Sequence, residues 1–146
     1  MSASQGHIVP TSIAVGEDAF YLGNLGEFDP GANGHSSVFR LSRSGHLSLV
    51  ASGLTAVTGV AVRHGQIYAL EAFTGFFAPT PDVANTGTIV KLNRHGGWDT
   101  VVTGLSFPTA MTFGSDGNLY VSNRGFGQQT NTAGEIVKVQ LSHEDD

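Results

Sequence analysis

Three polar side chains recur at matching places in the sequence, and their residue types could do chemistry. Asn24, Glu71 and Asn123 each follow a short run rich in apolar and aromatic residues. Amide and carboxylate oxygens suit hard cations, so calcium is the candidate ion, and a polar ligand is the other. The alternative that needs no ligand is that these side chains satisfy backbone groups at strand ends.

Three threonines recur in the same way, and they could face a ligand beside these polar residues. They are Thr11, Thr58 and Thr109. Threonine hydroxyl groups also bond to nearby backbone groups in turns. The alternative is therefore that the three threonines fix the chain connection that precedes them.

His35 and Arg124 are the remaining candidates for ligand binding, and both lie in predicted loops. His35 follows Glu27 and Asp29, so an acid and base pair could form in that loop. The histidines lack the spacing of a zinc motif, and the chain has no cysteine. We therefore assign no catalytic residue and no metal ligand from the sequence.

A repeat of about 50 residues places these candidates. The copies cover residues 10–54, 57–105 and 108–146, and Tyr21, Tyr68 and Tyr120 align among them. The segments 37–54 and 88–105 match without a gap. Such a match is hard to obtain by chance, so the chain is predicted to be one domain built from three similar units.

Each repeat is predicted to hold four short strands. In the first copy they are 12–15, 19–23, 37–41 and 47–51, rich in Val, Ile, Leu, Phe and Tyr. No segment has the apolar spacing of a helix. Four strands in a repeat of this length predict an all-β chain, a β-propeller with one four-stranded blade per repeat, and a two-sheet sandwich is the alternative.

Composition narrows the classes of partner. The chain has 146 residues, a net charge of -5, and 20 glycines, roughly twice the usual share. An acidic chain does not suit the phosphate backbone of nucleic acid. No apolar run is long enough to span a membrane, and no signal peptide is evident, so the cytoplasm is the default location.

With these motifs in place, the chain resembles the NHL-type six-bladed β-propellers, most closely the bacterial scytonemin-cluster propeller proteins. The matching residues are Pro-Thr-x-Ile and Pro-Thr-x-Met at 10–13 and 108–111, the run DGNLYVSN at 116–123, and the segments ending in Ser-Gly-Leu and Thr-Gly-Leu. The resemblance implies the propeller fold over almost the whole chain. That family usually carries about twice this many blades per chain and often a secretion signal.

Three blades do not close a ring, because propellers contain about four to eight. Six is the multiple of three in that range, so we expect a homodimer that closes a six-bladed ring. The first residues align with the last strand of a repeat, which the third copy lacks. Residues 1–9 are therefore expected to supply a closing strand to a partner blade. The alternative is that the chain is a piece of a longer propeller.

Function is expected where the connections are long. The predicted loops at 25–36, 72–87 and 124–134 all lie at one end of the strands, and binding residues collect in such loops on a rigid scaffold. We therefore expect a non-enzymatic binding or interaction module for a small-molecule or protein ligand. The alternative is a metal-assisted hydrolase or lyase of the lactonase-like propeller type.

Overall fold

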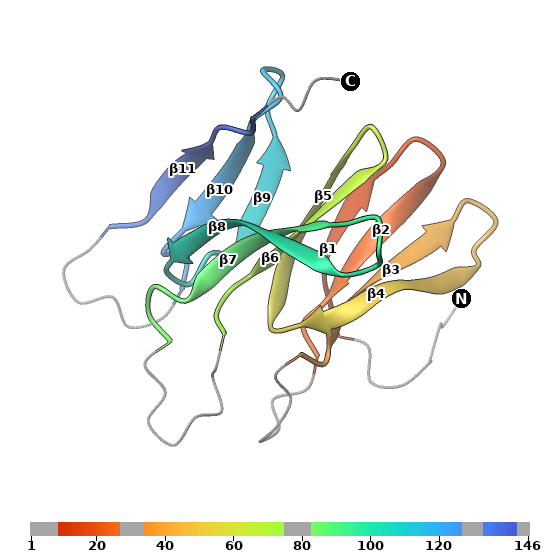
Figure 1. Cartoon of the computed structure of the whole chain (residues 1–146), viewed down its shortest axis with the longest axis horizontal. Coiled ribbons are helices and arrows are strands. Elements are labelled where there is room, and N and C mark those ends of the chain that lie inside the picture. The colour runs from red at the N-terminus through yellow and green to blue at the C-terminus, as the bar shows by residue number, and fades with distance from the viewer. Residues whose placement is uncertain (1–8, 27–33, 75–82, 127–132, 143–146) are drawn as a thin grey trace.

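The structure is a computed structural model of the chain. It describes residues 9–26, 34–74, 83–126 and 133–142. These residues form strands, turns and loops, with no helix among them (Figure 1). Within this part of the chain, therefore, no helix is a candidate for crossing a membrane. The all-β prediction is confirmed.

The described strands form three antiparallel sheets, in which strands that are consecutive in the chain pair with one another. The first sheet contains β1 (Pro10–Val15), β2 (Ala19–Asn24), β3 (Ser36–Ser42) and β4 (Leu47–Leu54). The second contains β5 (Val57–Arg63), β6 (Gln66–Glu71), β7 (Gly87–Leu92) and β8 (Trp98–Leu105). The third contains β9 (Ala110–Phe113), β10 (Leu119–Asn123) and β11 (Glu135–Val139).

The strand pattern follows from local sequence. Runs rich in Val, Ile, Leu, Phe and Tyr favour extended backbone and give the resulting sheet apolar side chains on one or both of its faces. Short turns then reverse the chain, as at Gly117 between β9 and β10, whose φ of 81° is readily adopted by glycine. The strands predicted in the first repeat differ from β1–β4 by three residues or fewer at each end.

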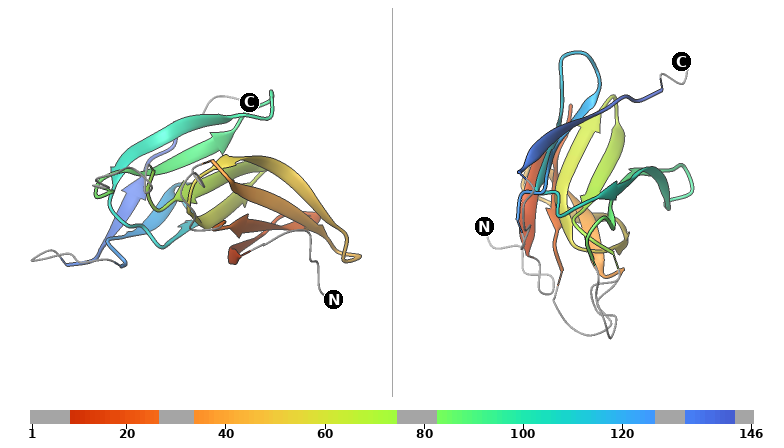
Figure 2. Two further views of the ribbon diagram at one scale, coloured as in Figure 1. Left: turned by 90° about the horizontal axis from the view of Figure 1, so that it is seen from below. Right: turned by 90° about the vertical axis from the view of Figure 1, so that its left-hand side faces the viewer.

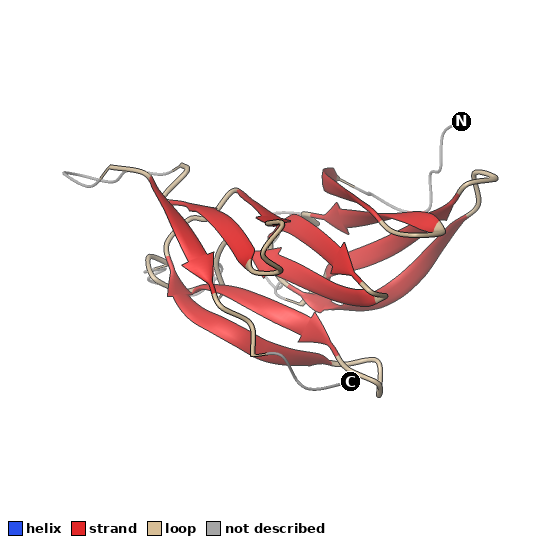
Figure 3. Ribbon diagram, turned by 90° about the horizontal axis from the view of Figure 1, so that it is seen from above, coloured by secondary structure: helices blue, strands red, loops and turns tan. Residues whose placement is uncertain are grey.

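The three sheets lie one against the next (Figures 2 and 3). Their first strands are neighbours, because β5 contacts both β1 and β9. Side chains of a strand alternate between the two faces of its sheet. We call the face turned toward the preceding sheet in the chain the upstream face and the opposite one the downstream face. In the first sheet, the downstream face is the one that packs on the second sheet.

Two apolar cores fill the spaces between the sheets. Between the first and second sheets, Val38 of β3 packs with Val60 of β5 and Ala69 of β6. Between the second and third sheets, Ile89 of β7 packs with Val121 of β10. The second sheet therefore contributes to both cores, whereas each outer sheet contributes to one.

The closing strand predicted at residues 1–9 is not tested, because residues 1–8 lie outside the described residues. The third sheet has three strands among the residues that the structure describes, and β11 is at its edge. An edge strand presents unpaired backbone groups that can bind a further strand. The expectation about residues 1–9 therefore stays a prediction.

Candidate functional site

The three recurrent polar residues end the second strand of each sheet, and all three are buried. Asn24 is the last residue of β2, Glu71 of β6 and Asn123 of β10. We call this end of the sheets the loop end, because the connections 25–35, 72–86 and 124–134 begin here. The opposite end, with its short hairpin connections, is the turn end.

Each of the three side chains accepts a hydrogen bond from the backbone just before a first strand. The bonds are Val9 N to Asn24 Oδ1 at 2.7 Å, Thr55 N to Glu71 Oε1 at 2.6 Å, and Ser106 N to Asn123 Oδ1 at 2.8 Å. A buried backbone N–H without a partner costs about 1–3 kcal/mol. The recurrent position therefore ties the incoming chain to the end of the second strand.

A second hydrogen bond differs between the sheets. Glu71 pairs in register with Thr88 of β7, whose hydroxyl donates to Glu71 Oε2 at 2.7 Å. Asn123 pairs with Glu135 of β11, and its Nδ2 donates to Glu135 Oε1 at 2.8 Å. The carboxylate thus lies on the second strand of one sheet and on the third strand of the other.

Glu71 is the one buried carboxyl among the three. Burial raises its pKa above the ordinary value, while the hydrogen bonds from Thr88 and from the Thr55 backbone lower it. Burial is the largest of these effects, so the folded chain disfavours the charged carboxylate relative to the protonated carboxyl. A carboxyl with a raised pKa is a functional-site candidate, although a structural bond to the backbone perturbs it in the same way.

The calcium hypothesis depends on whether these oxygens are available. Among the described residues, no three His, Asp or Glu side chains come together as a metal-binding group. Asn24 Oδ1 accepts from two backbone N–H groups, those of Val9 and Gly26. Both carboxylate oxygens of Glu71 accept hydrogen bonds as well. A cation at this position would have to share these oxygens with the chain connections.

Two of the three recurrent threonines form hydrogen bonds between sheets. The Thr11 hydroxyl donates to the Val57 carbonyl at 2.5 Å, and the Thr58 hydroxyl donates to the Pro108 carbonyl at 3.0 Å. In both cases the acceptor lies just before the matching threonine of the next sheet. Thr109 is in the third sheet, and its hydroxyl lies 3.2 Å from Ser122 Oγ.

His35 and Arg124 both lie at the loop end but do not form one cluster with a proton-transfer partner in the described part. His35 is exposed and directly precedes β3. Its predicted partners Glu27 and Asp29 lie outside the described residues. Arg124 follows β10 with a φ of 57°, its N–H donates to the Ser106 carbonyl at 2.8 Å, and its Nη1 is 3.6 Å from Glu135 Oε2.

Sequence analysis did not single out Glu135. It lies between Asn123 and Arg124 and contacts both side chains. Its position matches Ser37 and Thr88 in the other copies, so the repeat alone showed a change from hydroxyl to carboxylate. The pairing of β10 with β11 places this carboxylate directly beside Asn123, which the repeat pattern alone does not show.

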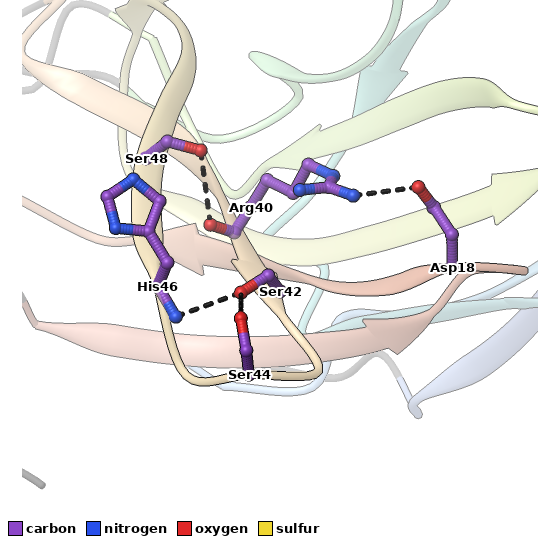
Figure 4. A network of polar contacts seen from close by, with 6 residues as sticks. All are labelled: Asp18, Arg40, Ser42, Ser44, His46 and Ser48. Carbon is purple, nitrogen blue, oxygen red and sulfur yellow. Dashed lines mark hydrogen bonds and ion pairs between the residues drawn. The ribbon is translucent and has the colours of Figure 1, made fainter.

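The turn end carries its own charged pairs, which are exposed. Arg40 Nη2 lies 2.7 Å from Asp18 Oδ2, and this bond lowers the pKa of Asp18 and raises that of Arg40 (Figure 4). Lys138 Nζ lies 2.8 Å from Asp116 Oδ2 in the third sheet and holds the pKa of that carboxyl well below its usual range. Exposed pairs of this kind add little stability.

Comparison with solved structures places this geometry among known folds. A putative gluconolactonase has a TM-score of 0.51 at 17% identity, over 78% of this chain and 41% of its own. The computationally designed Ika4 protein has a TM-score of 0.42 at 13% identity, over 95% of this chain and 96% of its own. Streptogramin B lyase has a TM-score of 0.38 at 20% identity, over 92% and 55%.

The fold is all-β and propeller-like. The assignment rests on the likeness to the putative gluconolactonase, of whose length the chain spans 41%. No protein-family model and no curated protein matches the sequence. At 17% identity this likeness describes the fold and leaves the chemistry to be argued from the residues.

Proposed function

We propose that the three sheets are three propeller blades and that the chain is a non-enzymatic binding or interaction module. Its ligand would contact the loop end. The NHL-type family membership expected from the sequence is part of the same proposal. Propellers present ligand sites on one end of a rigid ring of sheets, because long connections there can vary without disturbing the core.

One observation supports a binding role over a catalytic one. Asn24, Glu71 and Asn123 each accept a hydrogen bond from a backbone N–H in the segment that precedes the first strand of the same sheet. These side chains are thus engaged in holding the chain connections, which is a scaffold role. Among the described candidates predicted from the sequence, His35 and Arg124 would then meet a ligand at the loop end, together with the threonine hydroxyls if a ligand displaces their present bonds.

We further propose that two copies close a six-bladed ring. Each outer sheet packs against one neighbour within the chain, whereas a blade in a closed ring packs against two. A second copy would supply the missing neighbours by twofold symmetry. The loop ends of both copies would then lie on the same side of the ring and present each candidate residue twice.

The binding proposal is tested by mapping ligand contacts with amide chemical shifts. The probes are a panel of neutral saccharides, aldonic lactones and their carboxylates, each titrated with and without calcium chloride. We expect shifts at the loop end, and His35→Ala with Arg124→Met should weaken binding at least several-fold. His46→Ala, at an exposed turn-end histidine, is the matched control. Shifts confined to the turn end would overturn the proposal.

A metal-assisted hydrolase or lyase is the second candidate, and the buried Glu71 favours it. A carboxyl whose pKa burial raises can act as an acid or base in hydrolysis, and one similar solved structure is a putative gluconolactonase. The test is pH-stat hydrolysis of an aldonic lactone with calcium, manganese or zinc chloride. Turnover that Glu71→Gln abolishes would replace the binding proposal with this one.

A further inference from the structure

The first sheet has an open upstream face made of large apolar side chains. Its six positions are Ile13, Val15, Phe20, Leu22, Phe39 and Leu41. Ile13 is 61% exposed and Val15 is 68% exposed. The positions that match Ile13 in the second and third sheets are Val60 and Met111, which are 4% and 9% exposed. Val60 and Met111 are buried because a preceding sheet packs on them, and both belong to the cores between sheets.

The third sheet has an open face on its other side, the downstream face, which no following sheet covers among the described residues. Ile136 is 70% exposed, whereas the matching Val38 and Ile89 are fully buried against the following sheet. Ala110 and Thr112 of β9 are exposed on the same face. Like the downstream faces of the other two sheets, this face has small residues on the first strand, a tyrosine on the second strand, and a β-branched residue and a Lys or Arg on the third. The second sheet differs by having Leu70 where the third sheet has Ser122.

The two open faces therefore have the composition of the two sides of each internal interface. Upstream faces in this chain are apolar and mostly large, and downstream faces carry small residues, a β-branched residue and a tyrosine paired in register with a Lys or Arg. Within the chain, a downstream face always packs on an upstream face. The free downstream face of the third sheet and the free upstream face of the first sheet are thus complementary by the chain's own pattern.

The same hydrogen bond links each sheet to the next one in the chain, from a threonine hydroxyl to a backbone carbonyl. Thr11 of the first sheet donates to the Val57 carbonyl of the second, and Thr58 of the second donates to the Pro108 carbonyl of the third. Thr109 holds the matching position in the third sheet. By the same rule its acceptor is the carbonyl of the residue that precedes Thr11, which is Pro10.

We propose that the downstream face of the third sheet docks on the upstream face of the first sheet of a second copy. Thr109 Oγ1 donates to the Pro10 carbonyl of that copy, and twofold symmetry forms the same contact twice. This inference rests on the proposed ring and names the surfaces that close it. A second copy is the occupant because it continues the interface already formed twice inside the chain, which an unrelated apolar partner would not.

The first test measures solution mass by light scattering on the 146-residue chain. We expect about twice 15.2 kDa for the unaltered chain. Ile13→Lys and Ile136→Lys should each give a folded monomer, with the dissociation constant raised on the order of a hundredfold or more by burial of an unpaired charge. Circular dichroism shows whether each variant is folded.

Leu49→Lys is the matched control. Leu49 is an exposed apolar residue on the upstream side of the first sheet, paired in register with Phe39. Its match in the second sheet is Thr100, which stays exposed although that face is covered. We therefore expect Leu49→Lys to remain a dimer, because the docked sheet does not reach this position. Loss of the Leu49→Lys dimer would contradict the proposed register of the two faces.

Mixing the two lysine variants distinguishes this docking from other arrangements. A mixed dimer of Ile13→Lys and Ile136→Lys keeps one unaltered interface, so mixing should restore part of the dimer. If only Ile13→Lys dissociates the dimer, the first sheet pairs with itself, and the proposal is wrong. If the unaltered chain is a monomer, the proposal is also wrong, and a second copy is not what covers the two open faces.

Thr109→Val tests the hydrogen bond separately. Its loss should raise the dissociation constant about fivefold for each interface, whereas Thr100→Val on the exposed part of β8 should leave it unchanged. A dimer that binds none of the probes named above would retain this inference and remove the proposed binding function. A monomer that binds a probe at its loop end would retain the proposed binding function and remove this inference.

Discussion

The second sheet and the third sheet carry the same kinds of side chains in different surroundings. Ile89 of β7 is fully buried between the second and third sheets, and Ile136 of β11 is among the most exposed large apolar residues described. Their neighbours along the strands are also similar, a lysine two residues on and a valine between. The comparison shows that the same position of the repeat is buried where a following sheet covers it and exposed where the described residues place no sheet over it.

The largest effect expected from this comparison is on the free energy of unfolding. Ile89→Ala should lower it by about 2–5 kcal/mol, because the change leaves a cavity in a packed core. Ile136→Ala should change it by less than about 0.5 kcal/mol in an Ile13→Lys background, where the proposed docking is blocked. Urea unfolding followed by circular dichroism measures both. Equal losses at the two positions would show that Ile136 is covered within its own chain.

A smaller effect is expected where the first sheet approaches the second. A methyl carbon added at Gly23 would lie 2.6 Å from Ser12 Oγ and 2.8 Å from Val57 Cγ1. Gly23→Ala should therefore lower the free energy of unfolding by about 1–3 kcal/mol through overpacking.

The matching residue on the open face of the third sheet is Ser122. In an Ile13→Lys background, where the proposed docking is blocked, Ser122→Ala removes the hydroxyl that accepts from Thr109 Oγ1 at 3.2 Å, and we expect a loss of about 1 kcal/mol or less. The same urea experiment compares the two variants. If Gly23→Ala were as mild as Ser122→Ala, the first two sheets would be able to move apart at little cost.

Much of the fold could be predicted from the sequence, because short strands and turns depend on local residue types. Short runs rich in Val, Ile, Leu, Phe and Tyr were sufficient to place strands. The recurrent position of Asn24, Glu71 and Asn123 was also visible. Its hydrogen bonds to backbone N–H groups agree with the alternative that needed no ligand.

The rest of the candidate site could not be predicted, because it depends on which strands and sheets are neighbours. The threonine acceptors lie in the next sheet, about 50 residues away, so no local turn rule identifies them. The contact of Glu135 with Asn123 depends on the pairing of β10 with β11. The predicted calcium ion and homodimer depend on partners other than this single chain, and both remain predictions.

The smallest expected effect concerns the one strand-end residue that distinguishes the second sheet from the outer two. Glu71 occupies the position at which the first and third sheets have asparagine. Its pKa is raised above 4.5 in the folded chain, mainly by burial, so the folded state binds its proton more tightly than the unfolded state. Its contribution to stability is therefore most favourable below pH 4.5 and declines as the pH rises through the folded pKa.

Glu71→Gln removes this titration but keeps an oxygen for the Thr55 N–H and a side-chain group for the Thr88 hydroxyl. Relative to the unaltered chain, the variant should therefore gain stability between pH 4 and pH 7, by about 1 kcal/mol or less. Urea midpoints at the two pH values measure the gain, and Glu17→Gln, an exposed carboxyl, controls for the change in net charge. If the variant instead lost stability as the pH rose, the charged carboxylate would be favoured in the folded state. The second sheet would then differ from its neighbours by holding a stabilising charge rather than tolerating a buried one.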